Sequence, residues 1–79
     1  MKIRVKLFGT LPQRYPDYDS NQGLEVEIPD GAKVKDLLAR LEISASDSGL
    51  VAIDNLVVQH DHDLKDGGSV RIFQRAFGG

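Results

Sequence analysis

The residues that could most readily take part in a reaction are the last ones of the sequence. Gly78 and Gly79 follow Phe77 there, shortly after a stretch with the alternation of a strand. Glycine has no Cβ, so a Gly-Gly end can enter a space too narrow for other residues and reach backbone angles closed to them. The alternative is a frayed terminus without a role, the ordinary state of a domain end. Gly78 and Gly79 are therefore the first residues whose possible role has to be explained.

A second candidate is the run His60-Asp61-His62-Asp63, whose side chains are of the metal-binding type. In an extended segment His60 and His62 would share one face. A protein metal site, however, needs about three or four convergent ligands with supporting hydrogen bonds, and the sequence shows no further cluster of such residues. We therefore expect a solvated loop here, with no bound metal or cofactor.

Other catalytic groups are missing from the sequence. There is no cysteine, so no side chain can supply a thiolate nucleophile or carry a persulfide, and no disulfide can brace the domain. No nucleophile–base pair or cofactor loop is apparent, and Gly67-Gly68 is interpreted as a turn because no helix follows it to bind phosphate. We expect a chain that is not catalytic alone.

Composition limits the class of protein. The 79 residues are 41 % hydrophobic and 28 % charged, which predicts one domain over residues 1–79. A chain with a net charge of −2 lacks the positive electrostatic field that nucleic-acid binding needs. No apolar run approaches the roughly 20 residues of a membrane span, and strand-like alternation from the first residues leaves no signal peptide. We expect a cytoplasmic protein with no nucleic-acid or membrane partner.

Hydrophobic alternation predicts the strands that would position the terminal segment. They are expected at residues 2–8, 24–28, 50–53, 56–59 and 69–73. A long connection, residues 9–23, joins the first two strands, and Asp54-Asn55 forms a two-residue hairpin turn. If the first two strands pair antiparallel, Lys2, Arg4 and Lys6 share a face with Glu25 and Glu27, and opposite charges across such a pair stabilise it.

One amphipathic helix separates the two groups of strands. Its apolar stripe recurs at i, i+3, i+4 and i+7 and consists of Val34, Leu37, Leu38 and Leu41. A single sheet must cover this helix, which gives a two-layer α+β domain. The connections place the first and last strands side by side and parallel at the sheet centre. This topology is the β-grasp, a mixed sheet of four to five strands packed on one main helix, with residues 74–79 as a flexible tail.

Five stretches of the chain, taken in order, carry a family resemblance. They are VKLF at residues 5–8, IPDGAKVKDLL at 28–38, LVAIDN at 50–55, LKDGGSV at 64–70 and the final Gly78-Gly79. In this order and at this length, the chain resembles the ubiquitin-like sulfur carriers of the MoaD/ThiS family over essentially its whole length.

The resemblance implies how the terminus would work. In similar proteins an E1-like adenylating enzyme of the MoeB/ThiF type uses ATP to adenylate the C-terminal carboxylate. Sulfur is then transferred to it, and the resulting thiocarboxylate donates sulfur in cofactor biosynthesis. Gly79 would be the adenylated and thiocarboxylated residue, and Gly78 would give it access to a narrow active site. The folded body would be a handle for the tail.

Family members differ in the acceptor of the sulfur. Molybdopterin-synthase small subunits act with a larger MoaE-type subunit, and thiamine carriers act with a ThiG-type thiazole synthase. The long connection at residues 9–23 is more similar to the molybdopterin type, which favours molybdenum/tungsten cofactor biosynthesis and makes the chain the small subunit of a synthase-type sulfurtransferase. Residues 74–77, Gln-Arg-Ala-Phe, depart from that type, which often has prolines there. The thiamine pathway is therefore the alternative.

Aromatic and basic residues around the last strand are candidate partner contacts. Phe77 can insert into a partner's pocket, as interface anchors do, or fold back on its own sheet. Phe73 shares the strand parity of Arg71, so with Phe8 it would form an exposed docking patch, unless the strand end twists and Phe73 caps the core. Arg71 and Arg75 would meet acidic groups of the partner, although lone surface arginines usually contribute little.

Two other functions fit the same terminus. A ubiquitin-like protein modifier would be joined through Gly79 to lysines of other proteins, because that reaction also begins with acyl adenylation. A plain β-grasp interaction module would carry its glycine tail without using it. The chemistry at Gly79 separates these alternatives from a sulfur carrier.

Overall fold

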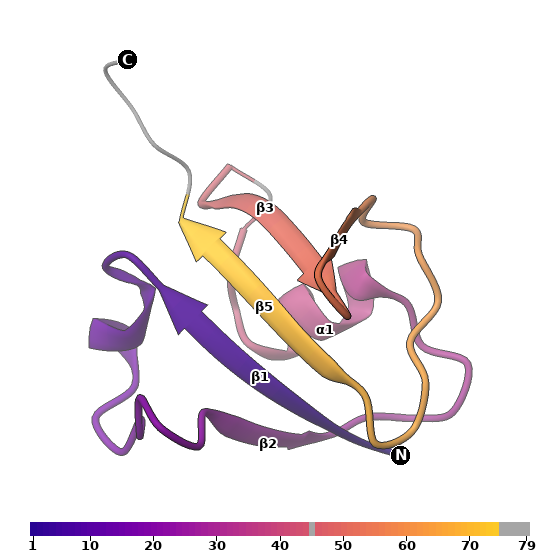
Figure 1. Ribbon diagram of the computed structural model, residues 1–79, viewed down its shortest axis with the longest axis horizontal. Helices are drawn as coiled ribbons and strands as arrows, with labels where there is room; N and C mark the ends of the chain where they lie inside the picture. The colour runs from indigo at the N-terminus through magenta and orange to yellow at the C-terminus, as the bar shows by residue number, and fades with distance from the viewer. Residues whose placement is uncertain (45, 75–79) are drawn as a thin grey trace.

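The computed structural model describes residues 1–44 and 46–74. Its centre is a five-stranded sheet with strand order β2-β1-β5-β3-β4, and α1 packs across one face (Figure 1). The strands are β1 (Lys2–Phe8), β2 (Leu24–Glu27), β3 (Ser48–Ile53), β4 (Leu56–Val58) and β5 (Ser69–Gln74), and the helices are α1 (Val34–Arg40) and the short 3-10 helix η1 (Leu11–Arg14). β1 and β5 are parallel neighbours at the sheet centre, and the other paired strands are antiparallel. The predicted two-layer α+β topology is confirmed.

The core lies between the two central strands and α1. Alternate residues of β1 and β5 point toward the helix, and the predicted stripe of α1 points back at them. The most deeply buried of these side chains, each 0–1 % exposed, are Ile3, Val5, Val70, Ile72, Val34 and Leu37. At seven residues, α1 is far shorter than the roughly 20 residues of a membrane span, and no other helix within residues 1–44 and 46–74 could cross a bilayer.

Two of the three cations predicted to face glutamates across β1 and β2 do so, whereas Lys6 lies beyond the end of that pairing. Lys2 lies opposite Glu27, and Arg4 lies opposite Glu25. The Glu25 carboxylate is 3.6 Å from Lys2 Nζ and 3.5 Å from Arg4 Nη2. Because these groups are exposed, each pair contributes little to stability, and the two cations share the one carboxylate of Glu25.

Four strand ends differ from the prediction. β2 and β4 each end one residue early, at Glu27 and Val58, and the other two differences have a visible cause. β3 begins at Ser48 rather than Leu50, because a bulge between these residues shifts the register with β5 and breaks the alternation that marks a strand in sequence. β5 continues through Gln74, which pairs with Ser48. Gln74 therefore belongs to the sheet rather than to the predicted tail, and residues 75–79 lie outside the described part of the chain.

The long connection between β1 and β2 folds back onto the domain. η1 buries Leu11, and the Tyr15 hydroxyl donates a hydrogen bond to the carbonyl of Leu41 at the end of α1. Partial burial raises the pKa of Tyr15. The Tyr18 hydroxyl accepts the N–H of Leu7 at 2.8 Å, so Tyr18 is a structural residue rather than the surface turn residue that its sequence context suggests.

Candidate functional site

The terminal segment starts from one end of the sheet centre. The last described residue, Gln74, ends β5 beside the end of β1 (Figure 1). Four of the predicted site residues lie outside the described part, and their roles stay predictions: Arg75, Phe77, Gly78 and Gly79. Three are described and come together on the adjacent strands β1 and β5: Phe8, Arg71 and Phe73.

Phe8 and Phe73 form a stacked aromatic pair on the open face of the sheet. They lie opposite each other in the parallel register of β1 and β5, with ring centroids 4.7 Å apart and ring planes inclined by 13°. Their strand parity is opposite to that of the buried Leu7 and Ile72, so both rings lie on the side away from α1. Phe73 thus stacks on Phe8 instead of capping the core, and its contact with a partner stays a prediction.

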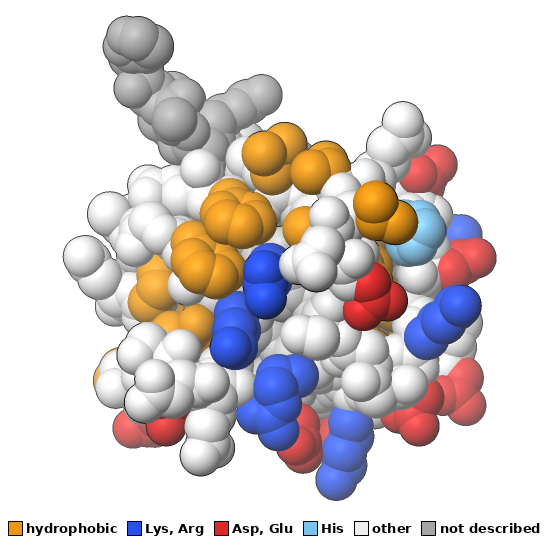
Figure 2. Space-filling model, in the orientation of Figure 1, with side chains coloured by type: hydrophobic (Ala, Val, Ile, Leu, Met, Phe, Trp, Pro, Cys, Tyr) orange, Lys and Arg blue, Asp and Glu red, His pale blue; other side chains and the backbone are white. Residues whose placement is uncertain are grey.

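Two apolar residues that the sequence analysis did not single out extend this pair. Leu50 lies opposite Phe73 on the other side of β5 and is 55 % exposed. Val57, on β4 opposite Ala52, is 66 % exposed. We call Phe8, Leu50, Val57 and Phe73 the sheet patch. Figure 2 shows hydrophobic side chains gathered on this face, around the end of β5.

Two cations border the sheet patch without a carboxylate of their own. Lys6 and Arg71 lie opposite each other in the register of β1 and β5, and neither forms an ion pair with a described residue. Arg71 Nη1 donates to Asn55 Oδ1 at 3.3 Å. Adjacent like charges across strands repel each other, so an acidic group of a partner would relieve this repulsion.

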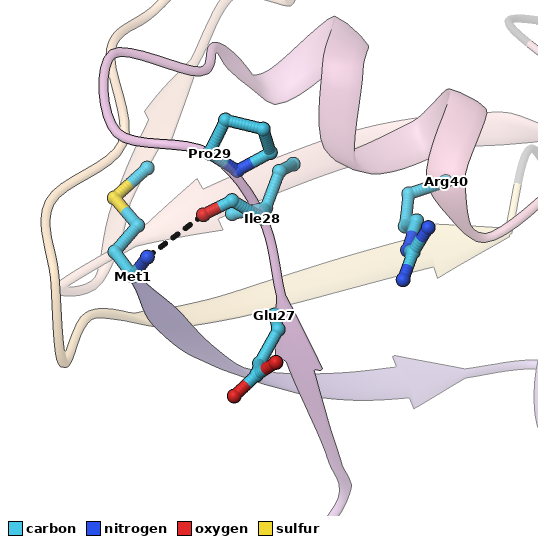
Figure 3. Close-up of a pocket in the computed structure, with 5 residues that line it drawn as sticks. All are labelled: Met1, Glu27, Ile28, Pro29 and Arg40. Atoms are coloured by element: carbon cyan, nitrogen blue, oxygen red, sulfur yellow. Dashed lines mark hydrogen bonds between the residues drawn. The ribbon is translucent and has the colours of Figure 1, made fainter.

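Two broad hollows of the described surface are open to solvent. One, of about 430 Å³, adjoins the sheet patch and is lined in part by Lys6, Phe8, Tyr18 and Arg71. Another, of about 470 Å³, lies near the start of β1 and is lined by Met1, Glu27, Ile28, Pro29 and Arg40 (Figure 3). No predicted site residue lines the second hollow. The predicted site residues that are described, Phe8, Arg71 and Phe73, therefore lie on an open face of the sheet rather than in an enclosed pocket.

Backbone carbonyls in the run from His60 to Asp63 accept hydrogen bonds from the start of α1. The N–H of Val34 donates to the His62 carbonyl at 2.9 Å, and the N–H of Lys35 donates to the His60 carbonyl at 2.7 Å. These bonds satisfy amide groups of the first turn of α1, which Lys33 cannot cap with a side-chain acceptor. Within residues 1–44 and 46–74 no cluster of three or more potential metal ligands occurs.

The arrangement of strands and helix defines the class of the protein. Parallel central strands β1 and β5, flanked by antiparallel strands and covered on one face by a single helix, form a ubiquitin-like β-grasp. The sequence model of the ThiS family matches residues 5–79, and the chain belongs to this family of MoaD/ThiS ubiquitin-like proteins. No curated protein sequence matches the chain.

Several solved structures share this fold. A putative molybdopterin converting factor, subunit 1, from Pyrococcus furiosus is 25 % identical, with a TM-score of 0.76 over 96 % of this chain and 99 % of that chain. SAMP1 from Haloferax volcanii is 16 % identical, with a TM-score of 0.72 over the whole of both chains. A chain from the complex of subunits 1 and 2 of molybdopterin-converting factor from Helicobacter pylori is 19 % identical, with a TM-score of 0.61 and full coverage of both chains.

Proposed function

We propose that the protein is a sulfur carrier whose Gly79 carboxyl group is adenylated and then converted to a thiocarboxylate for molybdopterin biosynthesis. The observation that carries this proposal is the ThiS-family match, which runs through Gly78 and Gly79. The absence of cysteine supports it, because no thiol of this chain can compete for the activated acyl group.

The chemistry requires two steps on one carboxyl group. A carboxylate oxygen of Gly79 attacks the α-phosphorus of ATP in the activating enzyme, and pyrophosphate leaves as the acyl adenylate forms. A sulfur nucleophile at the oxidation level of sulfide then attacks the carbonyl carbon, and AMP leaves. Gly78 and Gly79 have no Cβ atoms that would obstruct a narrow active site. The carrier supplies the reacting group, and its partners supply ATP and catalysis.

The sheet patch is the proposed docking surface for these partners. Its apolar residues and the bordering cations, Lys6 and Arg71, lie on the same end of the sheet as Gln74. A partner bound there would hold the terminal residues close to its own active site, and such positioning raises the effective concentration of a reactant. We propose that an E1-like adenylating enzyme and a larger acceptor subunit use this face in turn.

Two features favour the molybdopterin pathway over the thiamine pathway. The Pyrococcus structure, a putative molybdopterin converting factor subunit 1, is 25 % identical over nearly the whole of both chains. The long connection between β1 and β2 also holds η1 and packs Leu11 and Tyr15 onto the domain, so it is a built part of this fold. The Helicobacter relative was solved with its subunit 2, and we propose a corresponding larger partner for this chain.

The test is the mass of the carrier after incubation with an E1-like adenylating enzyme of the MoeB/ThiF type, ATP and sulfide. We expect the mass to rise by one oxygen-to-sulfur exchange, located at Gly79 by fragmentation. A variant lacking Gly79 is the control and should gain nothing. Isopeptide adducts on lysines of other proteins, without a thiocarboxylate, would favour a protein modifier. An unchanged mass with enzymes that activate other family members would contradict acyl activation.

A second experiment identifies the acceptor of the sulfur. The thiocarboxylated carrier is mixed in turn with a molybdopterin-synthase large subunit and a thiazole synthase, each with its substrate. Loss of the thiocarboxylate only with the first would support the proposed pathway. Loss only with the second would assign the carrier to thiamine biosynthesis.

A further inference from the structure

The end of β5 is held from both of its neighbouring strands at Gln74. On one side the Gln74 backbone pairs with Ser48 of β3. On the other side the Gln74 side chain crosses the end of β1, where its Oε1 accepts the N–H of Thr10 at 2.7 Å. An amide N–H can only donate, so the carboxamide must present its oxygen to Thr10.

Gly9 leaves the space that the Gln74 side chain occupies. Gly9 has φ +75°, and a Cβ built on it would lie 2.6 Å from Gln74 Oε1 and 2.8 Å from Gln74 Cβ. Any other residue would therefore meet the Gln74 side chain and would also be strained at this backbone angle. We call the contact of Gln74 with Gly9 and Thr10 the strand-end clasp.

The residues around the strand-end clasp are themselves fixed. Thr10 is the N-cap of η1, whose Leu11 is buried. Arg14, the last residue of η1, pairs at 2.9 Å with Asp47, which precedes Ser48. Gln74 thus connects the end of β5 to two anchored flanks. The clasp joins it to the η1 side, and its backbone pairing joins it to the start of β3.

A fixed Gln74 limits where the terminal carboxyl group can go. Residues 75–79 can span at most about 17 Å when fully extended. If Gln74 were released from β1, the segment that must be ordered in a partner's active site would grow, and ordering each additional residue costs conformational entropy.

We propose that Gln74 is a positioning residue: its hydrogen bond to Thr10 fixes the point from which residues 75–79 reach the adenylating site of the partner. The inference rests on the proposed function and adds to it a residue that touches neither ATP nor the reacting carboxyl group. It requires that the clasp affect the reaction of the bound carrier more than the affinity of docking.

Gln74→Leu removes the acceptor, and Gln74→Glu keeps an oxygen acceptor in the same place. Gln59→Leu is the matched control, because Gln59 is exposed and lies after β4, away from the clasp. Gly9→Ala tests the clasp from the other side. Pyrophosphate exchange by the adenylating enzyme is measured against carrier concentration, together with hydrogen exchange of the Thr10 amide and the melting temperature of each variant.

For Gln74→Leu we expect the rate at saturating carrier to fall about three- to tenfold with little change in KM, because docking is intact and only the terminal segment is less well positioned. Gly9→Ala should behave likewise, while Gln74→Glu and Gln59→Leu should stay near wild type. The Thr10 amide should exchange faster in Gln74→Leu and Gly9→Ala, with core amides unchanged.

Wild-type kinetics for Gln74→Leu despite faster Thr10 exchange would overturn the positioning role, as would a loss in Gln74→Glu equal to that in Gln74→Leu. Unchanged Thr10 exchange in Gln74→Leu would show that the clasp does not form. If the wild-type carrier itself is never adenylated, the proposed function fails and the positioning role with it, while the Thr10 exchange rates still report whether the contact exists.

Discussion

Phe8 and Phe73 present aromatic surface that no described segment of the chain covers. Large aromatic side chains bury much area for little conformational entropy and are frequent anchors of interfaces. Because the two rings stack at 4.7 Å, they offer one continuous apolar surface rather than two separate side chains. The affinity of the carrier for its partners should therefore depend strongly on this pair.

Phe73→Ala is expected to lower kcat/KM for adenylation by about tenfold or more, mainly through KM, because an anchor of the docking surface is lost while the terminal residues are unchanged. Leu56→Ala is the matched control. Leu56 is 69 % exposed, but it lies opposite Ile53, on the side of the sheet that α1 covers. Steady-state kinetics on both variants, with melting curves to show folding, make the comparison, and equal kinetics would contradict the assignment.

Local sequence patterns predict some residues of the sheet patch and the strand end but not others. Alternation along β1 and β5 is regular, so parity favours the open face for Phe8, Arg71 and Phe73. It leaves open the capping of the core by Phe73, which the stacking on Phe8 excludes. Leu50 could not be placed in this way, because residues 50–53 are all apolar and show no alternation, and the bulge after Ser48 breaks the parity with the residues before it. The sequence predicts Gln74 as part of the tail, since its contact with Thr10 joins residues 64 positions apart and no local pattern encodes such a contact.

At the scale of elements, the connection between β1 and β2 completes the edge of β1. The described pairing of the two strands extends only to Val5 and Leu24, so the backbone of Leu7 has no strand partner on that side. The Tyr18 hydroxyl takes the place of the missing strand partner and accepts a hydrogen bond from the Leu7 N–H at 2.8 Å. A partly buried amide without a hydrogen-bond partner lowers the stability of the folded state. The Tyr18 hydroxyl therefore stabilises the fold.

Tyr18→Phe is expected to lower the free energy of unfolding by about 1 kcal/mol, because the Leu7 N–H loses its acceptor while the ring still packs. Ser20 is an exposed residue of the same connection, and Ser20→Ala should change the free energy of unfolding by no more than about 0.5 kcal/mol. Urea titrations followed by circular dichroism measure both. A Tyr18→Phe variant as stable as wild type would show that water replaces the hydroxyl at this edge.

The loop at residues 60–63 is the second element whose role is visible only in the structure. Periodicity predicts α1 well, because Val34, Leu37 and Leu38 repeat with the helical period. Its N-terminal capping could not be predicted, because the accepting carbonyls belong to His60 and His62, far along the chain. Lys33 Nζ adds a contact of 2.7 Å to Asp63 Oδ1 that holds the loop against the helix.

Asp63→Asn should remove a pH-dependent part of the stability. The hydrogen bond from Lys33 lowers the pKa of Asp63 and raises the pKa of Lys33. The Asp63 contribution is therefore present above its ordinary pKa and lost as pH falls through its lowered pKa in the folded state. The Lys33 contribution is present below its ordinary pKa and lost as pH rises through its raised pKa.

The difference in unfolding free energy between wild type and Asp63→Asn should accordingly be small and constant near neutral pH, and should shrink below about pH 4 and above about pH 10. Asp61→Asn is the control, because the Asp61 carboxylate makes no described ion pair. Denaturation at several pH values gives both differences. A difference for Asp63→Asn that persists unchanged at acid pH would exclude the ion pair as its cause.

At the scale of the whole molecule, charge and apolar surface are distributed unevenly. The chain carries a net charge of −2, yet Lys6 and Arg71 stand beside the sheet patch without a described carboxylate, whereas Lys2 and Arg4 share Glu25. Figure 2 shows basic side chains bordering the hydrophobic ones on this face. A partner with acidic groups around an apolar contact would match this distribution, and local fields of this kind chiefly affect association rates.

Lys6→Glu should slow association with the adenylating enzyme by about three- to tenfold at low ionic strength, because the local field at the docking face becomes repulsive to acidic groups. Lys35→Glu changes the net charge by the same amount. Lys35 is exposed on α1, on the opposite side of the sheet from the sheet patch, so this variant should have little effect. Stopped-flow measurements over a range of salt concentrations should show the two variants converging as the Debye length shortens. If both variants slow association equally at low salt, the net charge of the chain governs the encounter, and the pairing of Lys6 with an acidic group of the partner is wrong.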